Sequence, residues 1–410
     1  MKIGVWVNEP LNKSSGGGFT YFNALLAGID NFDFGAGIEI VLLSAHNLSG
    51  FAKPAINVKP HQRELPFVVK VFRKFLKIIS VVAFGRWINF LDQKEKKIKD
   101  QSIADYLKTQ GVKIIFYPLP SSAVIDGIPY IVNNWDLAHY ATYAFPEITD
   151  DNGFNRRNEW YLKVMPSALL IFCESEAGKK ELVQYLNINP DKIKVLPIFC
   201  SKEFVGMQVG PAEQDKILAT LGLTAGNFFF YPAQFWAHKN HFHLVKAFSK
   251  YVQLHPGNKL FFCGSDKGNI DYIKTQVKTL GLERSVIFGG FIEEEVLFTL
   301  YKNAAALVMP TFFGPTNIPP IEAMFLECPA LLSDIEGHYE IMGAGARYFN
   351  PMDDDSIVNS MMAIVDDTTR ATIVANQKQQ AKTTPHKIER ALVQMQAHFA
   401  EAIKIRSTWE

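Results

Sequence analysis

The chain has 410 residues, of which 48% are hydrophobic and 13% aromatic, and its formal net charge is +1. This length accommodates two domains of ordinary size, and the apolar content predicts packed cores rather than disorder. The small net charge argues against nucleic acid as the main partner. No segment offers the roughly 20 uninterrupted apolar residues that a membrane span requires.

Four cysteines, at positions 173, 200, 263 and 328, are scattered without CxxC spacing and lie mostly in apolar runs. They predict buried thiols in a reducing compartment, not a zinc site or a disulfide framework. Residues 1–7 predict a β-strand and not a signal peptide, because no long apolar region follows them. We therefore expect a cytoplasmic α/β protein.

Short apolar runs alternate with helical stretches, which is the pattern of βαβ units and parallel sheets. In the first half, strands are predicted at 2–7, 39–44, 113–117, 130–133, 168–173 and 194–197. In the second half, they are predicted at 227–232, 259–264, 285–289, 304–309 and 330–333. Helices are predicted at 22–29, at 243–251, from about Pro319 and at 385–409.

The pattern divides the chain into domains at 1–203 and 204–384, with 385–410 as a helix that packs back on the first domain. The boundary lies in an irregular stretch that is broken at Gly206 and again at Gly210. Two doubly wound sheets joined in this way place a cleft between the carboxyl ends of their strands, where ligands bind in such folds.

Three glycines, Gly16, Gly17 and Gly18, follow the first predicted strand and precede a helix. Glycine at the start of a helix lets the backbone come close to a ligand such as a phosphate. A plain tight turn explains the pattern equally well.

The segment 65–99 departs from this plan, because apolar and aromatic residues are interleaved with lysine and arginine. Such a helix suits an anionic membrane surface. A helix packed in the core with a solvated basic edge, or an oligomer contact, is an equal alternative.

Asp136 and His139 follow the predicted strand 130–133, so both side chains are expected to project into the cleft. A carboxylate and an imidazole there can bind an acceptor or assist proton transfer from its hydroxyl. Alternatively, Asp136 caps a turn and His139 is a structural histidine.

Two further loops follow strands of the second half. Lys239 stands between the strand 227–232 and the helix 243–251, where a fixed positive charge suits a departing diphosphate. Glu322 lies one turn into the helix that follows the Gly/Pro loop 310–320, where it suits sugar hydroxyls. Either residue alone is ordinarily a solvated charge, and the pair indicates a nucleotide-sugar site.

Three stretches stand in order in this chain: WDLxH at 135–139, YPAQFWxHKNH at 231–241 and FGPTNxPPxEA at 313–323. On these stretches the chain resembles glycosyltransferase family 4, and within it bacterial polysaccharide and O-antigen transferases, over nearly its whole length. The resemblance implies retaining enzymes with the GT-B fold, in which two Rossmann-like, doubly wound parallel-sheet domains face each other across a cleft.

The resemblance also assigns site residues. Catalytic roles fall to Lys239 and Glu322 on the donor side and to Asp136 and His139 on the acceptor side. The residues implied to contact the donor are Gly16, Gly17, Gly18, Gln234, Lys239, Gly289, Gly290, Phe291, Gly314, Thr316, Asn317, Ile318 and Glu322. Among them, Lys239 contacts the diphosphate, Glu322 the ribose hydroxyls and Phe291 the nucleobase.

Two positions depart from the pattern of many relatives. Gly314 stands where a first Glu precedes Glu322 in an E-x7-E pattern, and Gln234 stands where an Arg precedes Lys239. Losing one carboxylate and one cation keeps the charge balance of the site but changes which donor hydroxyls are recognised.

The implied activity is transfer of a hexose, mannose or a related sugar, from a GDP- or UDP-linked donor. The acceptor is a hydroxyl of a glycan or of a lipid-linked saccharide in cell-surface polysaccharide synthesis. No metal and no other cofactor are implied, and the implied location is cytoplasmic, with peripheral contact to the membrane through 65–99. The alternative is a non-catalytic glycan- or nucleotide-binding subunit that has kept the fold.

The membrane prediction can be tested with liposomes that contain anionic lipid. Replacing Phe72 or Trp87 by Glu puts a charge on the apolar side of the segment, so both variants should lose binding that the parent chain shows. Cosedimentation measures this, and binding that is unaffected by both substitutions rejects the membrane reading.

Overall fold

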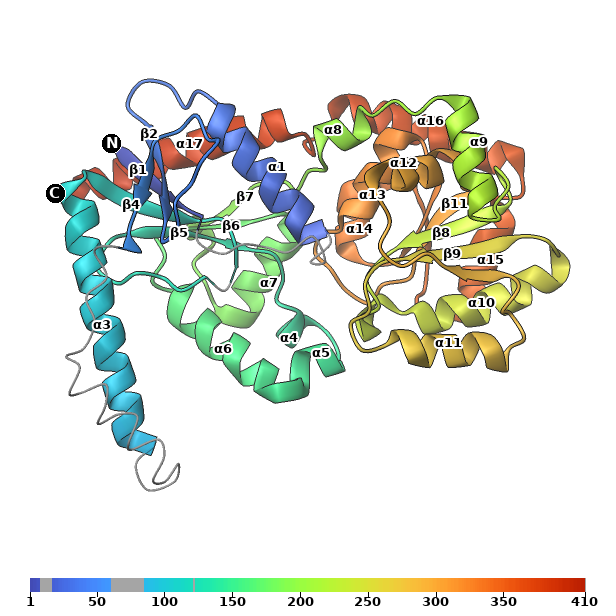
Figure 1. Cartoon of the computed structure of the whole chain (residues 1–410), viewed down its shortest axis with the longest axis horizontal. Coiled ribbons are helices and arrows are strands. Elements are labelled where there is room, and N and C mark those ends of the chain that lie inside the picture. Colours follow the sequence, from blue (N-terminus) through green and yellow to red (C-terminus); the bar gives the residue numbers. More distant parts are fainter. Residues whose placement is uncertain (8–16, 60–84, 121, 410) are drawn as a thin grey trace.

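The computed structural model describes residues 1–7, 17–59, 85–120 and 122–409, and for 85–89 it describes only the helical backbone. Within this part the chain forms two lobes, each built on one parallel sheet (Figure 1). The first sheet has seven strands in the order β3-β2-β1-β4-β5-β6-β7, and the second has six in the order β10-β9-β8-β11-β12-β13. The predicted pair of doubly wound parallel sheets is confirmed.

The elements of the first lobe alternate between strand and helix. They are β1 (Lys2–Trp6), α1 (Gly17–Asn31), β2 (Glu39–Ser44), β3 (Ala55–Asn57), α3 (Gly85–Thr109), β4 (Val112–Tyr117), β5 (Tyr130–Asn134), α4 (Ala138–Ala141), α5 (Pro146–Thr149), α6 (Gly153–Val164), β6 (Leu170–Cys173), α7 (Glu176–Leu186) and β7 (Ile193–Val195).

The second lobe follows the same plan. Its elements are α8 (Lys202–Val205), α9 (Pro211–Thr220), β8 (Phe228–Pro232), α10 (His241–Leu254), β9 (Lys259–Cys263), α11 (Ile270–Thr279), β10 (Val286–Phe288), α12 (Glu294–Asn303), β11 (Ala306–Met309), α13 (Ile318–Leu326), β12 (Ala330–Ser333), α14 (Glu336–Met342), β13 (Arg347–Phe349), α15 (Asp354–Ala363) and α16 (Asp367–Thr383). A final helix, α17 (Ile388–Arg406), leaves this lobe.

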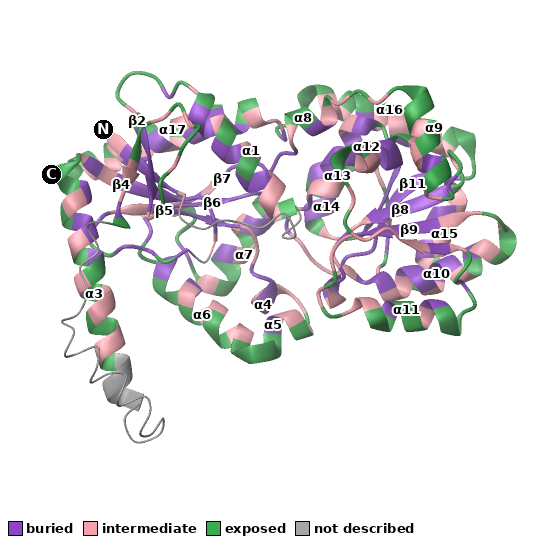
Figure 2. Ribbon diagram, viewed as in Figure 1, coloured by how far each residue is buried: buried purple, intermediate pink, exposed green. Residues whose placement is uncertain are grey.

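The central strands are buried on both faces because helices cover both sides of each sheet. In β8, for example, residues 228–231 are all buried, and Figure 2 shows buried strands inside helices whose outer faces are exposed. Parallel strands covered in this way are continuously apolar, which is why the sequence located them. Two strands of three residues, β3 and β13, were not predicted. Both lie at a sheet edge and are only partly buried, so they carry a weak apolar signal.

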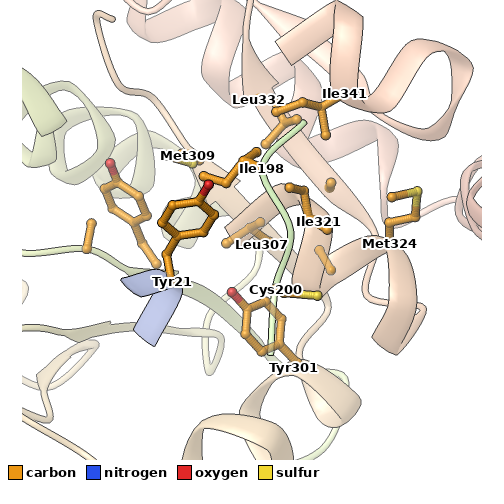
Figure 3. Packing of buried hydrophobic residues seen from close by; sticks show 14 of the residues in the cluster. Tyr21, Ile198, Cys200, Tyr301, Leu307, Met309, Ile321, Met324, Leu332 and Ile341 are labelled. Atoms are coloured by element: carbon orange, nitrogen blue, oxygen red, sulfur yellow. The ribbon is translucent and has the colours of Figure 1, made fainter. Parts of the chain in front are cut away.

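One continuous apolar cluster runs through both lobes, so the lobes share a core at their junction. Figure 3 shows part of it, with Tyr21 of α1 from the first lobe and Leu307 and Ile321 from the second. The four cysteines are buried and unpaired, as predicted.

Helix α17 returns from the second lobe to the first and lies along α1 (Figure 1). Its Phe399 is fully buried against three aromatic rings of the first lobe. The ring centroids lie 5.6 Å from Phe34, 5.6 Å from Phe116 and 6.1 Å from Phe172. The return of the chain therefore adds a helix to the core of the first lobe.

Of the segment 65–99, residues 65–84 lie outside the described residues. Helix α3 projects from the first lobe (Figure 1), and Ile103 and Leu107 near its end are buried while Phe90 is 54% exposed. Among the described helices, none is long and apolar enough to cross a membrane. Contact of this segment with a membrane surface stays a prediction.

Replacing Phe399 by Ala should lower the free energy of unfolding by about 3–5 kcal/mol, because it opens a cavity among three aromatic rings. Urea unfolding followed by fluorescence measures the loss. The matched control on the same helix is Val393→Ala, whose side chain is 56% exposed, and its effect should stay within about 0.5 kcal/mol. Equal effects of the two substitutions would show that α17 is not part of the core.

Candidate active site

A cleft lies between the lobes, lined by residues that follow β5 and β6 in the first sheet and β8 and β11 in the second. It has two compartments. One, of about 450 Å³, contains Lys239, and the other, of about 700 Å³, contains Glu322. We call them the Lys239 compartment and the Glu322 compartment. They adjoin, because six residues line both: Gly17, Pro232, Ala233, Gln234, Ile318 and Pro319.

Most of the predicted site residues line this cleft. The Lys239 compartment includes Gly17, Gly18, Asp136, Gln234, Gly314, Thr316, Asn317 and Ile318. The Glu322 compartment includes Gly17, Gln234, Gly290, Phe291 and Ile318. Gly289 and His139 line neither compartment, and Gly16 lies outside the described residues.

Lys239 is held in place by its backbone and its side chain. It ends a short 3-10 turn (Ala237–Lys239) after β8, and its carbonyl accepts a hydrogen bond of 2.9 Å from the Tyr231 hydroxyl. The ammonium donates to Asn317 Oδ1 at 3.1 Å. Burial lowers the pKa of Lys239 to about 8. Among the described residues no carboxylate forms a salt bridge with it, so this cation is poised for an anion from outside the protein.

A chain of hydrogen bonds fixes the amide of Asn317 at the N-terminus of α13. His338 Nδ1 lies 2.9 Å from the carbonyl of Ser333, and this contact leaves Nε2 as an acceptor for Asn317 Nδ2 at 3.1 Å. The amide oxygen of Asn317 therefore faces Lys239. Since a helix N-terminus also favours negative charge, the ammonium and the start of α13 point to a common anion site.

Glu322 is on α13, buried at the edge of the adjoining compartment. Its Oε2 accepts a hydrogen bond of 2.7 Å from the Tyr301 hydroxyl. Burial raises the pKa of Glu322 to about 7. The Tyr301 hydroxyl thus orients the carboxyl group through Oε2, and Oε1 remains as a hydrogen-bonding atom for a ligand.

The glycines at the start of α1 have little room for a side chain. A Cβ at Gly17 would come within 3.3 Å of Ile318 Cδ1 in the opposite lobe, and a Cβ at Gly18 within 3.1 Å of the Trp135 ring in its own lobe. Gly17 lines both compartments and Gly18 the Lys239 compartment, so side chains there would narrow the cleft. That the backbone here lies beside a ligand stays a prediction.

Asp136 lines the Lys239 compartment but is already engaged. Its Oδ1 accepts hydrogen bonds from the backbone N–H of Ala138 at 2.9 Å and from Arg157 Nη2 at 2.5 Å. It therefore closes a turn, as in the alternative reading, and also presents an ion pair to the cleft. Its proposed role toward an acceptor stays a prediction.

His139 is packed away from the cleft. Its ring centroid lies 4.5 Å from Tyr140, 5.6 Å from Phe154 and 5.0 Å from Tyr161, and neither ring nitrogen has a hydrogen-bond partner among the described residues. Burial lowers the pKa of His139 to about 4, so the ring is neutral at pH 7. The ring is packed as in a structural histidine, but its nitrogens are not satisfied among the described residues, so the alternative of a satisfied structural histidine is met only in part. A catalytic role would require the ring to move.

Two carboxyl groups that the sequence did not single out connect the lobes across the cleft. Glu147 of α5 accepts a hydrogen bond of 3.0 Å from the backbone N–H of His238, and its Oε1 also contacts Nδ1 of that ring. Glu174, which follows β6, accepts a hydrogen bond from the Thr316 hydroxyl. Burial raises the pKa of Glu174 to about 8.

Sequence reasoning had a signal for only some of these residues. Glu174 directly follows a predicted strand, so the argument that selected Asp136 applies to it equally. Glu147 and His338 follow no such rule, because they lie on the short helices α5 and α14. Glu147 lines the cleft, and His338 contacts Asn317 without lining it. Their positions come from the tertiary structure alone.

The sequence pattern of the family "Glycosyl transferases group 1" matches residues 214–382. The second lobe is a group 1 glycosyltransferase domain. This match confirms the family that the motifs indicated, and it covers the part of the chain that carries Lys239 and Glu322.

Proteins similar in sequence to this chain include two O-antigen enzymes. The "O-antigen chain mannosyltransferase RfbU" of Salmonella typhimurium is 35% identical over 133 residues, which cover 32% of this chain and 36% of that protein. The "O-antigen chain mannosyltransferase B" of Escherichia coli is 24% identical over 220 residues, which cover 53% of this chain and 57% of that protein. The chain thus matches between about a third and just over half the length of these relatives.

Solved structures match the whole chain at low sequence identity. Sucrose-phosphate synthase from Thermosynechococcus elongatus has a TM-score of 0.70 at 16% identity, covering 98% of this chain and 99% of that one. Anabaena Alr3699/HepE in complex with UDP and glucose has a TM-score of 0.69 at 14% identity, covering 98% and 100%. These likenesses confirm the two-domain GT-B fold.

Binding of a nucleoside diphosphate should weaken above pH 8, because the amine of Lys239 loses its proton as the pH passes its lowered pKa. At pH 9 about a tenth of the amines keep the proton, so the dissociation constant should rise about tenfold relative to pH 7. Calorimetric titrations with GDP and UDP across this range measure the change. In Lys239→Arg the guanidinium stays charged, so this rise should disappear. An equal rise in both proteins would assign the titration to another group.

Proposed function

We propose that the chain is a retaining hexosyltransferase that moves mannose or a related hexose from a nucleoside-diphosphate sugar to a hydroxyl of a glycan or lipid-linked acceptor. The observation that carries this proposal is the pair Lys239 and Glu322, which line adjoining compartments of one cleft between the lobes. An ammonium group that forms no salt bridge with a carboxylate among the described residues suits a diphosphate, and a buried carboxyl group in the adjoining compartment suits sugar hydroxyls.

The donor lies across both compartments in this proposal. Its diphosphate binds the Lys239 ammonium and the backbone N–H groups at the start of α13, and its ribose binds Glu322. The base extends along Gly290 and Phe291, which line the Glu322 compartment. The transferred sugar occupies the Lys239 compartment, which also receives residues of the first lobe. An acceptor reaches the sugar from that lobe.

The proposed chemistry needs no covalent intermediate on the protein. The acceptor oxygen attacks the anomeric carbon from the face that the diphosphate leaves, so the bond to the phosphate breaks as the new glycosidic bond forms. The proton of the acceptor hydroxyl passes to a departing phosphate oxygen. Lys239 and the N-terminus of α13 stabilise the negative charge that develops there, which is the work that a metal ion does in other transferases.

The relatives support the hexose and the donor class. Two are named mannosyltransferases of O-antigen chains, which favours a mannosyl donor and a cell-surface polysaccharide acceptor. Anabaena Alr3699/HepE was crystallised in complex with UDP and with UDP-glucose, which favours a nucleoside-diphosphate donor for this chain. We propose GDP-linked mannose before UDP-linked sugars, and a cytoplasmic location with contact to the membrane through 65–99.

A thermal-shift screen distinguishes these donors. GDP, UDP and dTDP and their sugars are added to the purified chain, and a specific ligand raises the melting temperature by mass action. GDP-mannose should give the largest shift. A larger shift with UDP-glucose would change the assigned donor but not the assigned reaction.

Lys239→Ala and Glu322→Ala should each lower turnover by at least about 10²-fold, as is typical when one electrostatic contact in a closed site is removed. Release of the nucleoside diphosphate measures turnover. Matched controls are Lys216→Ala and Glu213→Ala, which break an exposed ion pair of 3.3 Å on α9 and should leave turnover unchanged. Near-normal rates in both site variants would reject the assignment. Nucleotide binding without transfer or hydrolysis in the parent chain would favour the non-catalytic alternative.

A further inference from the structure

The loop before α13 has no side chain at position 314. Gly314 has φ of +138°, a conformation that other residues rarely adopt. A Cβ at this position would lie 2.6 Å from Asn317 Nδ2, and that amide is fixed between Lys239 and His338. The geometry of the anion site therefore excludes a side chain at 314.

A carboxyl group from the other lobe reaches the same loop. Glu174 is only 5% exposed, lines the Lys239 compartment together with Gly314, and accepts a hydrogen bond from Thr316, two residues further along the loop. Thr316 is its only hydrogen-bond partner among the described residues. The other two carboxyl groups of the first lobe in this compartment face basic side chains: Asp136 is paired with Arg157, and Glu147 contacts the His238 ring. Of the three, Glu174 is the one whose partner among the described residues is a hydroxyl of the loop that contains Gly314.

We propose that Glu174 recognises a hydroxyl of the transferred sugar, in the space that Gly314 leaves, and so helps to determine which donor sugar is accepted. This inference rests on the proposed function, because it places the sugar in the Lys239 compartment. A carboxyl group held by Thr316 offers its second oxygen to the sugar. Because Glu174 and Gly314 come from different lobes, the sugar subsite is complete only when the lobes lie together as they do here.

The electrostatics of the pocket suit this role. Burial raises the pKa of Glu174, and the nearby Asp136 carboxylate raises it further, so the group is mostly neutral at pH 7. A neutral carboxyl group both donates and accepts hydrogen bonds, which matches a sugar hydroxyl. It also adds no negative charge next to the diphosphate. A site that hydrogen-bonds a substrate hydroxyl discriminates strongly against sugars that lack it.

Calorimetry on the full chain tests the proposal with four probes: GDP, GDP-mannose, UDP and UDP-glucose. The quantity of interest is the gain in affinity that the sugar adds to its parent diphosphate. For the sugar nucleotide that the parent chain prefers, Glu174→Ala should reduce this gain about 10-fold or more, the effect of one lost hydrogen bond in a buried site. The affinity for the diphosphate alone should stay within about twofold, because Lys239 is untouched.

The matched control is Glu340→Ala. Glu340 also connects the lobes, since its carboxylate accepts hydrogen bonds of 2.8 and 3.0 Å from the backbone N–H groups of Glu176 and Ala177, but it lies outside the compartment. If Glu174 only joined the lobes, both variants would lose the sugar-dependent gain equally. If Glu174→Ala does not fold, Glu174→Asp replaces it, because an acid shorter by one methylene should lose the contact and retain the pocket.

The outcomes separate this inference from the function on which it rests. A parent chain that binds none of the four probes overturns both. A parent chain that binds diphosphates without any gain from the sugar overturns the role of Glu174, and so does an unchanged gain in the Glu174 variants or an equal loss in Glu340→Ala. In these last cases the nucleotide site at Lys239 stands. Loss confined to the Glu174 variants supports the proposal.

Discussion

The site depends on a lysine ammonium that is largely removed from water and that forms no salt bridge with a carboxylate among the described residues. Burial of a lone charge disfavours the charged form, and the lowered pKa of Lys239 records this cost. The fold tolerates the cost because Tyr231 and Asn317 fix the backbone and the amine. In the proposed function a diphosphate supplies the negative charge, so affinity and leaving-group stabilisation come from the same contact.

The cleft between the lobes is held by polar contacts that cross it. Glu147 contacts His238, Glu174 contacts Thr316, and the Glu340 carboxylate binds two N–H groups at the start of α7. Below them the apolar core continues from one lobe to the other, and α17 returns to the first lobe. Residues from both lobes therefore meet around the Lys239 compartment. The second lobe supplies Lys239 and the start of α13, and the first lobe supplies the side chains that complete the compartment.

Sequence patterns located the buried strands because parallel strands covered on both sides must be apolar throughout. They missed β3 and β13, which are short, lie at sheet edges and are partly exposed. The motif residues Lys239, Glu322 and Asp136 line the cleft because each follows or lies close after a strand whose carboxyl end faces it. His139 follows the same strand as Asp136, but the turn into α4 directs its ring toward Tyr140, Phe154 and Tyr161.

The sequence by itself determined the two parallel sheets and the family of the second lobe. It also determined which strands are followed by the candidate site residues. It did so because apolar runs and strand-loop-helix motifs are local features. Only the tertiary structure decided which side chains from the two lobes meet. Glu174 and Thr316 are 142 positions apart, and no periodicity relates them. Their contact, and the partners of Asn317 and Asp136, follow from how the lobes pack, which depends on the whole core.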